Sequence, residues 1–117
     1  MSPKIKIFHN PKCSKSRATL QLLEEHNLEP LIIKYLEEPL DKGTIENILK
    51  KLGKEPQEIM RKTEQAYELN GLKDKNLTRP QLIEAIIQNP ILMERPIVLT
   101  NTKAAIGRPP ESVLKVL

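Results

Sequence analysis

The sequence predicts an α/β fold, and three neighbouring patterns lead to that prediction. Residues 4–8 alternate polar and apolar side chains, as a strand does, and residues 31–35 form a second short apolar run. Between them, residues 14–26 place apolar side chains at helical spacing. A strand, a helix and a strand in this order form a βαβ unit, whose parallel strands are joined by a right-handed crossover.

The middle of the chain is predicted to be helical. Asp41 is the expected N-cap of the clearest helix, and Gly53 ends it. The apolar face of this helix consists of Ile45, Ile48, Leu49 and Leu52. Shorter helical turns are expected at residues 57–60 and 65–70. Thr78 and Gln81 form a capping box that opens a further helix, which ends before Pro90.

Two strands and a helix are predicted to end the chain. Residues 97–99 and 103–107 are the expected strands, with a hairpin turn at residues 100–102. Pro109 and Pro110 open a short helix, with Val113, Leu114 and Leu117 expected on one face. This order resembles the thioredoxin/glutaredoxin architecture with a helical insertion at about residues 41–88. No linker interrupts the sequence, so one domain over residues 1–117 is expected.

Composition narrows the possible functions. The chain has 117 residues and a net charge of +4, which suits anionic ligands. Its charges are interspersed and only 3% of its residues are aromatic, so nucleic acid is not an expected partner. One cysteine and two histidines exclude an internal disulfide and favour no metal site. No signal peptide or membrane-length apolar run is present, so a cytoplasmic location without membrane attachment is expected.

Cys13, the only cysteine, lies where the first strand gives way to the first helix. The free N–H groups and the dipole at a helix start favour a thiolate, as do the cationic neighbours Lys12, Lys15 and Arg17. We therefore predict a reactive thiol, against the alternative of a cysteine buried as a small hydrophobic residue. Ser16 holds the second position of a Cys-x-x-Ser motif, where its hydroxyl can donate to a thiolate. Because serine cannot form a disulfide, the reducing thiol has to come from another molecule.

Other polar residues are candidates for the same site. His9 precedes Cys13 by four residues and can tune the thiol, or it can be an ordinary turn residue. Three arginines, Arg61, Arg95 and Arg108, border predicted segments. Guanidinium groups bind tetrahedral oxyanions through paired hydrogen bonds, although most arginines are solvated surface charges. Pro96, just before the third strand, stands where this architecture places a cis-proline next to the cysteine.

Several motifs together resemble the glutathione/glutaredoxin-coupled arsenate reductase family across nearly the whole chain. They are His9-Asn10-Pro11-x-Cys13-x-x-Ser16-Arg17-x-Thr19-Leu20, Arg61-Lys62, Asn89-Pro90-Ile91-Leu92, Arg95-Pro96-Ile97-Val98 and Arg108-Pro109. The runs Ser14-Lys15-Ser16 and Ile106-Gly107-Arg108-Pro109-Pro110 are most similar to a short housekeeping subgroup.

This resemblance implies a role for each matching residue. Cys13 would attack arsenate, with His9 and Ser16 supporting its thiolate and Arg17 and Pro96 supporting the site. Arg61, Arg95 and Arg108 would hold the oxyanion. Glutathione, a co-substrate rather than a bound cofactor, would attack the Cys13 adduct. Glutaredoxin would clear the thiol conjugate, and arsenite would leave.

Two other functions remain open at this point. A glutathione-dependent thiol oxidoreductase of another substrate would keep Cys13, but it would have little need for three arginines. Regulators that bind RNA polymerase resemble the chain in architecture, but their thiol sensors use Cys-x-x-Cys. Ser16 excludes such a disulfide switch here, and a pull-down would test polymerase binding.

Overall fold

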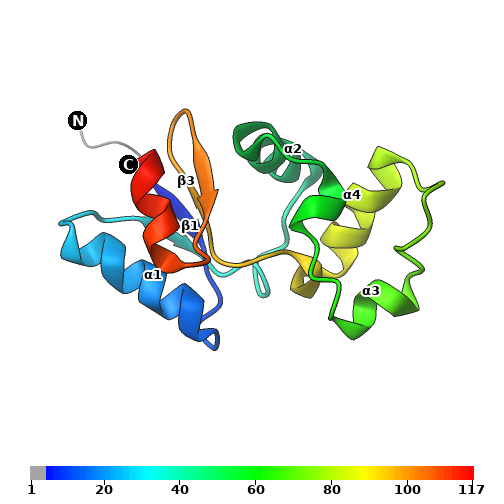
Figure 1. The fold of residues 1–117 in the computed structure, drawn as a ribbon, viewed down its shortest axis with the longest axis horizontal. Coiled ribbons are helices and arrows are strands. Elements are labelled where there is room, and N and C mark those ends of the chain that lie inside the picture. The colour runs from blue at the N-terminus through cyan, green and yellow to red at the C-terminus, as the bar shows by residue number, and fades with distance from the viewer. Residues whose placement is uncertain (1–4) are drawn as a thin grey trace. The chain divides into compact units, whose positions relative to one another are not determined.

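The computed structural model describes residues 5–117, which divide into two compact units (Figure 1). One unit combines the chain up to Glu38 with Arg95–Leu117, and the other is Pro39–Glu94. The first strand was predicted to begin at residue 4, and that residue lies outside the described part.

A four-stranded sheet forms the centre of the first unit. Its strands are β1 (Lys6–Phe8), β2 (Leu31–Ile33), β3 (Ile97–Leu99) and β4 (Ala104–Ile106), in the order β2-β1-β3-β4. Strands β1 and β2 are parallel, with Ile7 opposite Ile32. Strand β3 runs antiparallel to β1 and to β4. The predicted βαβ unit and the closing hairpin are thus confirmed.

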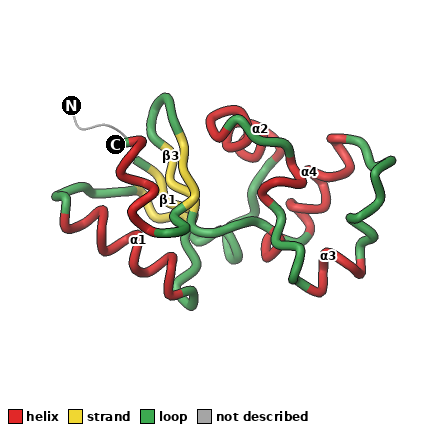
Figure 2. The backbone as a smooth tube through the Cα atoms, viewed as in Figure 1, coloured by secondary structure: helices red, strands yellow, loops and turns green. Residues whose placement is uncertain are grey.

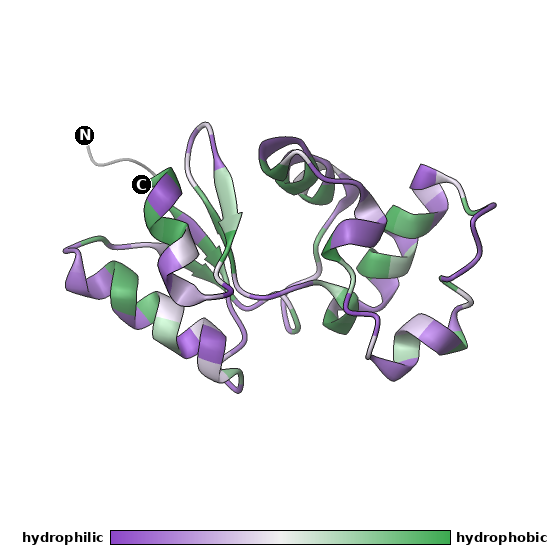
Figure 3. Cartoon of the chain, in the orientation of Figure 1, coloured by the Kyte–Doolittle hydropathy of each residue, from purple (hydrophilic) through white to green (hydrophobic). Residues whose placement is uncertain are grey.

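Two helical elements complete this unit, α1 (Ser14–Glu25) and the 3-10 helix η3 (Pro110–Val116), which lie against each other (Figure 1). Hydrophobic and hydrophilic residues alternate in bands along α1 (Figure 3). The apolar side chains that α1, η3 and the sheet bury together are Ile5, Ile7, Leu23, Val98 and Val113. This core fixes the start of α1 at the carboxyl end of β1.

The edges of the predicted strands are wrong by one or two residues. Strand β2 ends at Ile33 because the backbone of Lys34 turns instead of pairing. The N–H of Lys34 donates to a carboxylate oxygen of Glu38 at 2.9 Å, and its carbonyl accepts from the N–H groups of Glu37 and Glu38, each at 2.9 Å. Strand β4 starts at Ala104, since the carbonyl of Lys103 closes the hairpin turn with Thr100 at 2.8 Å.

The predicted face of the last helix is also wrong. The segment is a 3-10 helix, in which residues three apart share a face. Val113 is therefore buried and Val116 half-buried, whereas Leu114 and Leu117 are exposed.

The second unit consists of helices joined by loops (Figure 2). In chain order these are α2 (Lys42–Leu52), η1 (Pro56–Ile59), α3 (Gln65–Leu69), α4 (Arg79–Gln88) and η2 (Pro90–Leu92). The unit is longer than the predicted insertion at residues 41–88 because η2 was not predicted. A bridge between Met60 and Met93 then ties the end of the unit to its middle.

The predicted ends of the longer helices are confirmed. The carboxylate of Asp41 accepts from the N–H of Thr44 at 2.7 Å, and Gly53 ends α2 in the left-handed conformation, with φ of 67°. Thr78 and Gln81 exchange the two hydrogen bonds of a capping box at the start of α4. Within residues 5–117, no helix has the length and apolarity needed to cross a membrane.

Candidate active site

Cys13 is the N-cap residue of α1, and its extended backbone (φ −96°, ψ 123°) lies just outside the helix. Its N–H donates to the carbonyl of Asn10 at 3.0 Å, and its own carbonyl accepts from the N–H of Arg17 at 3.0 Å. The thiol is free and half-buried. The sulfur therefore faces the unpaired N–H groups of the first helical turn.

The surroundings of the sulfur favour its ionised form. Burial raises the pKa of the Cys13 thiol, but this effect is outweighed. The N–H of Ser16, the guanidinium of Arg95 and the N–H of Lys15 all stabilise the thiolate, so that its pKa lies below the ordinary value. At neutral pH the thiolate fraction of Cys13 is thus larger than that of a cysteine in an unfolded peptide, and the thiolate is the form that attacks as a nucleophile.

Ser16 acts on the thiol through its backbone. Its side chain is fully buried, and its hydroxyl oxygen lies 2.6 Å from Nδ1 of His9 and accepts from the N–H of Asn10 at 3.0 Å. The hydroxyl thus ties the loop after β1 to the first turn of α1. From the sequence this hydroxyl could donate to the thiolate; in the structure it is the N–H of Ser16 that lowers the pKa of the Cys13 thiol.

His9 is 6% exposed and directly follows β1. Burial lowers the pKa of its imidazole, and the positive charges of Lys34 and Arg17 lower it further. These effects favour the neutral form of His9, which serves as a hydrogen-bonding partner of Ser16 rather than as a cation beside the thiol.

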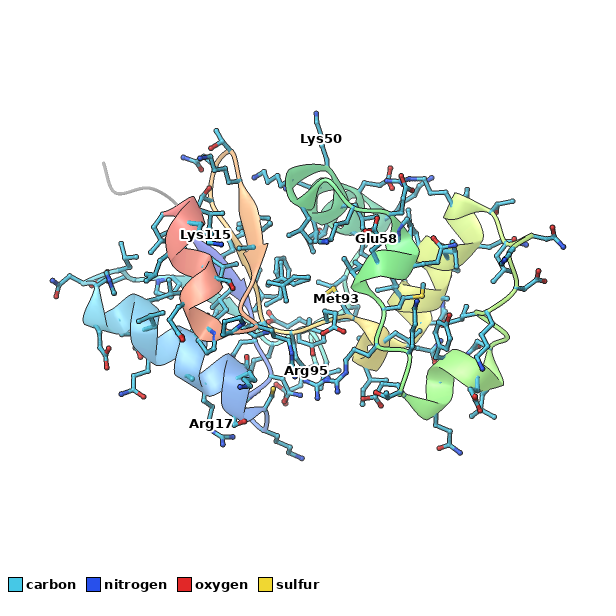
Figure 4. The ribbon with its side chains drawn as sticks, viewed as in Figure 1. Arg17, Lys50, Glu58, Met93, Arg95 and Lys115 are labelled. Atoms are coloured by element: carbon cyan, nitrogen blue, oxygen red, sulfur yellow. The ribbon has the colours of Figure 1, made fainter. Side chains whose placement is uncertain are left out.

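The loop between β1 and α1 is held by its own side chains. The side-chain oxygen of Asn10 accepts from the N–H of Lys12 at 3.0 Å. Arg17, near the start of α1 (Figure 4), donates from Nη1 to the carbonyl of Pro11 at 2.9 Å. The supporting role predicted for Arg17 is thus compatible with a brace on the loop that carries Cys13.

Arg95 lies on the segment that leads into β3 (Figure 4). Its Nε and Nη1 atoms are buried and have no hydrogen-bond partner within residues 5–117. A buried donor without a partner costs about 1–3 kcal/mol, so an anion that accepts from either atom would be stabilised here. The peptide bond between Arg95 and Pro96 is cis, as expected for this architecture.

Arg108 lies next to Arg95 in the first unit. Its Nη1 donates to the carbonyl oxygen of Arg95 at 3.1 Å, and its side chain is exposed. The structure thus brings together Cys13, His9, Ser16, Arg95 and Arg108 at one edge of the sheet unit.

Arg61 belongs to the other unit, Pro39–Glu94. Its N–H donates to the carbonyl of Leu92 at 2.6 Å, and its Nε lies 3.5 Å from a carboxylate oxygen of Glu64. Its Nη1 is buried without a hydrogen-bond partner in the described part of the chain. Its role in oxyanion binding stays a prediction from the sequence.

Two residues near the candidate site were not given a role in the sequence analysis. Thr19, on α1, is fully buried although it is polar, and Gly107 follows β4 where there is no room for a side chain. Both lie within the motifs quoted above, and a glycine between an apolar strand and an Arg-Pro pair is a signal of close backbone packing.

Comparison with known proteins gives a consistent result. The model of the ArsC family matches residues 8–116. A protein named arsenate reductase from Neisseria meningitidis serogroup A is 48% identical over 116 residues, which are 98% of this chain and 99% of that protein. The uncharacterized protein YfgD of Escherichia coli K12 is 50% identical over 118 residues, covering 100% of this chain and 99% of its own. A solved structure titled arsenate reductase from Vibrio cholerae superposes with a TM-score of 0.96 at 42% identity, and covers both chains fully (100%).

Proposed function

Because this chain belongs to the ArsC family, with a thioredoxin-like fold, we propose that it reduces arsenate to arsenite through the thiol of Cys13. The observation that carries the proposal is the position of that thiol. It lies at the start of α1 with a lowered pKa, and the guanidinium of Arg95 is beside it.

The first step proposed is attack of the Cys13 thiolate on the arsenic of bound arsenate. A sulfur–arsenic bond forms and one arsenate oxygen leaves as water. The N–H groups of Ser16 and Lys15 and the guanidinium of Arg95 stabilise the sulfur before attack. The buried Nε and Nη1 atoms of Arg95 have N–H groups that can donate to the oxyanion, and Arg108 adds a second positive charge from the same edge.

The reduction needs thiols from other molecules. Conversion of arsenate to arsenite takes two electrons, which two thiols supply when they join as a disulfide. Cys13 is the only cysteine of the chain, so it cannot supply that disulfide by itself and also return to its thiol form. We assign the two external thiols to glutathione, whose sulfur displaces a second arsenic-bound oxygen as water, and to glutaredoxin, whose thiolate attacks the glutathione sulfur. The glutathione–arsenic bond then breaks, its electron pair stays on arsenic, and the two external thiols leave as a mixed disulfide. Water cleaves the remaining bond between arsenic and Cys13, so that arsenite leaves and Cys13 is again a thiol.

The experiment is an assay of arsenite formation from arsenate, with glutathione and glutaredoxin supplied, for the wild type and Cys13→Ser. We expect turnover by the wild type and none by Cys13→Ser, with little change in the urea midpoint, because the thiol is half-buried. Omission of glutathione or glutaredoxin in turn tests each reductant. Turnover by Cys13→Ser would contradict the proposed mechanism, and a folded wild type without turnover would contradict the substrate.

A further inference from the structure

Gly107 directly follows β4 and directly precedes Arg108. Its backbone is buried, and its N–H donates to the carbonyl of Pro96 at 2.8 Å. The residue therefore links two segments of the candidate site, since Pro96 directly follows Arg95.

A side chain at position 107 has no room. An ideal Cβ there would lie 2.5 Å from Oγ1 of Thr19, 2.8 Å from Cγ of Pro96 and 3.1 Å from Cγ2 of Thr19. Real carbon atoms do not approach other atoms as closely as the first two distances. The space that a Cβ of residue 107 would need is thus already taken by Thr19 of α1 and by the ring of Pro96.

Neither neighbour of Gly107 can move away easily. Thr19 is fully buried, its β-branched side chain has few rotamers in a helix, and its hydroxyl donates to the carbonyl of Lys15 at 2.8 Å. Pro96 is also buried, and its ring has no flexible end. An added methyl group would therefore displace backbone, either of α1 or of the segments that hold Arg95 and Arg108.

Gly43 provides the contrast. A Cβ at that position would meet only Asp41 Oδ1 at 3.6 Å, an ordinary contact distance. The close approach is therefore a property of position 107 and is not shared by this other glycine, which has no positive φ either.

We propose that Gly107 is a positioning residue of the active site, whose bare α-carbon sets how closely the helix that begins at Cys13 approaches Arg95 and Arg108. Thr19 lies on that helix, while Pro96 and Gly107 are direct neighbours of the two arginines. Contact among the three residues thus fixes the separation between the nucleophile and the groups that bind the oxyanion.

The test compares Gly107→Ala with Gly43→Ala, Thr19→Ala and the double variant Gly107→Ala/Thr19→Ala. Because the chain has one cysteine, its alkylation rate as a function of pH reports the Cys13 pKa directly. We expect Gly107→Ala to raise this pKa by roughly half a unit, about a threefold loss of thiolate below the pKa, as Arg95 and the sulfur move apart. Gly43→Ala is expected to titrate like the wild type.

The double variant tests the contact itself. Removal of the Thr19 hydroxyl and methyl leaves only the Pro96 clash, so its Cys13 pKa is expected between those of Thr19→Ala and Gly107→Ala. If Gly107→Ala does not fold, the comparison of the double variant with Thr19→Ala carries the test. A destabilised Gly107→Ala with the wild-type Cys13 pKa would overturn the proposal, and so would a double variant that titrates like Thr19→Ala when the single variant does not fold.

Turnover is measured separately. Cys13 and Arg95 are the reacting and binding groups of the proposed function, so Gly107 affects arsenate reduction only if that function holds. In that case we expect Gly107→Ala to raise KM for arsenate, because the arginines would no longer lie at the right distance from Cys13 to hold the oxyanion. A wild type without arsenate turnover would contradict the proposed function alone, because the thiol titration does not depend on it.

Discussion

The Nδ1 atom of His9 lies 2.6 Å from the hydroxyl oxygen of Ser16, and both side chains are buried. This contact joins the end of β1 to the first turn of α1, on either side of Cys13. The same hydroxyl oxygen accepts from the N–H of Asn10 at 3.0 Å. One serine side chain thereby satisfies two buried polar groups of the loop that presents the thiol.

Ser16→Ala is predicted to act mainly on the stability of the protein and less on the pKa of the Cys13 thiol. The substitution leaves His9 Nδ1 and the Asn10 N–H without their partner, which costs about 1–3 kcal/mol. The N–H groups of Ser16 and Lys15 remain at the sulfur, so we expect a smaller rise in the Cys13 pKa than in Arg95→Gln. Urea unfolding and thiol alkylation measure the two effects, with the exposed Ser14→Ala as control. Equal unfolding midpoints for the two serine variants would contradict the prediction.

The stability of the protein is predicted to fall on mild acidification because of His9. Burial and the charges of Lys34 and Arg17 lower the pKa of His9 in the folded state, whereas the unfolded chain has the ordinary value of about 6.5. Between these two values the unfolded chain binds more protons. The contribution of His9 to the free energy of unfolding should therefore be constant above about pH 6.5 and decrease as the pH drops toward the folded-state pKa of His9.

Matched histidine variants isolate this effect. His9→Gln can still bond to Ser16 but does not titrate, so its unfolding free energy should depend less on pH in this window. His26→Gln, at the other histidine, which is exposed, is the matched control. Urea unfolding at several pH values between about 5 and 7.5 compares the three proteins. Identical slopes for both variants would show that His9 does not cause the pH dependence.

Most of the fold was predictable because local signals agree with the tertiary structure. Helix caps act within one or two turns of their helices, so they can be predicted from the sequence alone. Examples are Asp41, Gly53 and the capping box that starts at Thr78. The C-terminal end of β2 and the exposed face of η3 were not predictable. The former depends on a carboxylate of Glu38 that bonds to the backbone of Lys34, and the latter on a 3-10 rather than an α-helical period.

The residues that lie near Cys13 in the first unit were predictable from the sequence, but their contacts were not. The spacing of His9, Cys13 and Ser16 placed them at one strand-to-helix junction, where the structure has them. Which atom of Ser16 serves the sulfur depends on side-chain directions that no spacing encodes. The tight packing of Gly107 on Thr19 joins residues far apart in the chain, so only the folded structure reveals it.

Thr78→Ala is predicted to cost about 1 kcal/mol in the free energy of unfolding. The Thr78 hydroxyl accepts from the N–H of Gln81 at 3.3 Å, and the Gln81 side chain accepts from the N–H of Thr78 at 2.8 Å. Alanine removes the first bond of this pair and weakens the start of α4. The urea midpoint should fall with an unchanged m-value, while Thr63→Ala, in an exposed loop, should stay within about 0.5 kcal/mol of the wild type. Equal midpoints for the two threonine variants would contradict the prediction.

Arg95→Lys is predicted to lose much more activity than the conserved charge suggests. The Nε and Nη1 atoms of Arg95 are buried without a hydrogen-bond partner in the part of the chain that the structure describes, and a lysine ammonium cannot replace a planar guanidinium that binds an oxyanion through paired hydrogen bonds. Loss of one charge-assisted hydrogen bond to the oxyanion corresponds to about 1.5–3 kcal/mol, or roughly 10- to 100-fold in kcat/KM for arsenate.

The control for Arg95→Lys is Arg79→Lys, at an arginine that pairs with Glu46 at 3.1 Å and Glu55 at 2.9 Å in the other unit. We expect this control to keep the wild-type kinetics, because exposed ion pairs contribute little. Protection of Cys13 from alkylation by added arsenate measures binding apart from turnover, and Arg95→Lys should need more arsenate for the same protection. An unchanged protection curve together with an unchanged kcat/KM would show that Arg95 does not bind the oxyanion through a pair of donors.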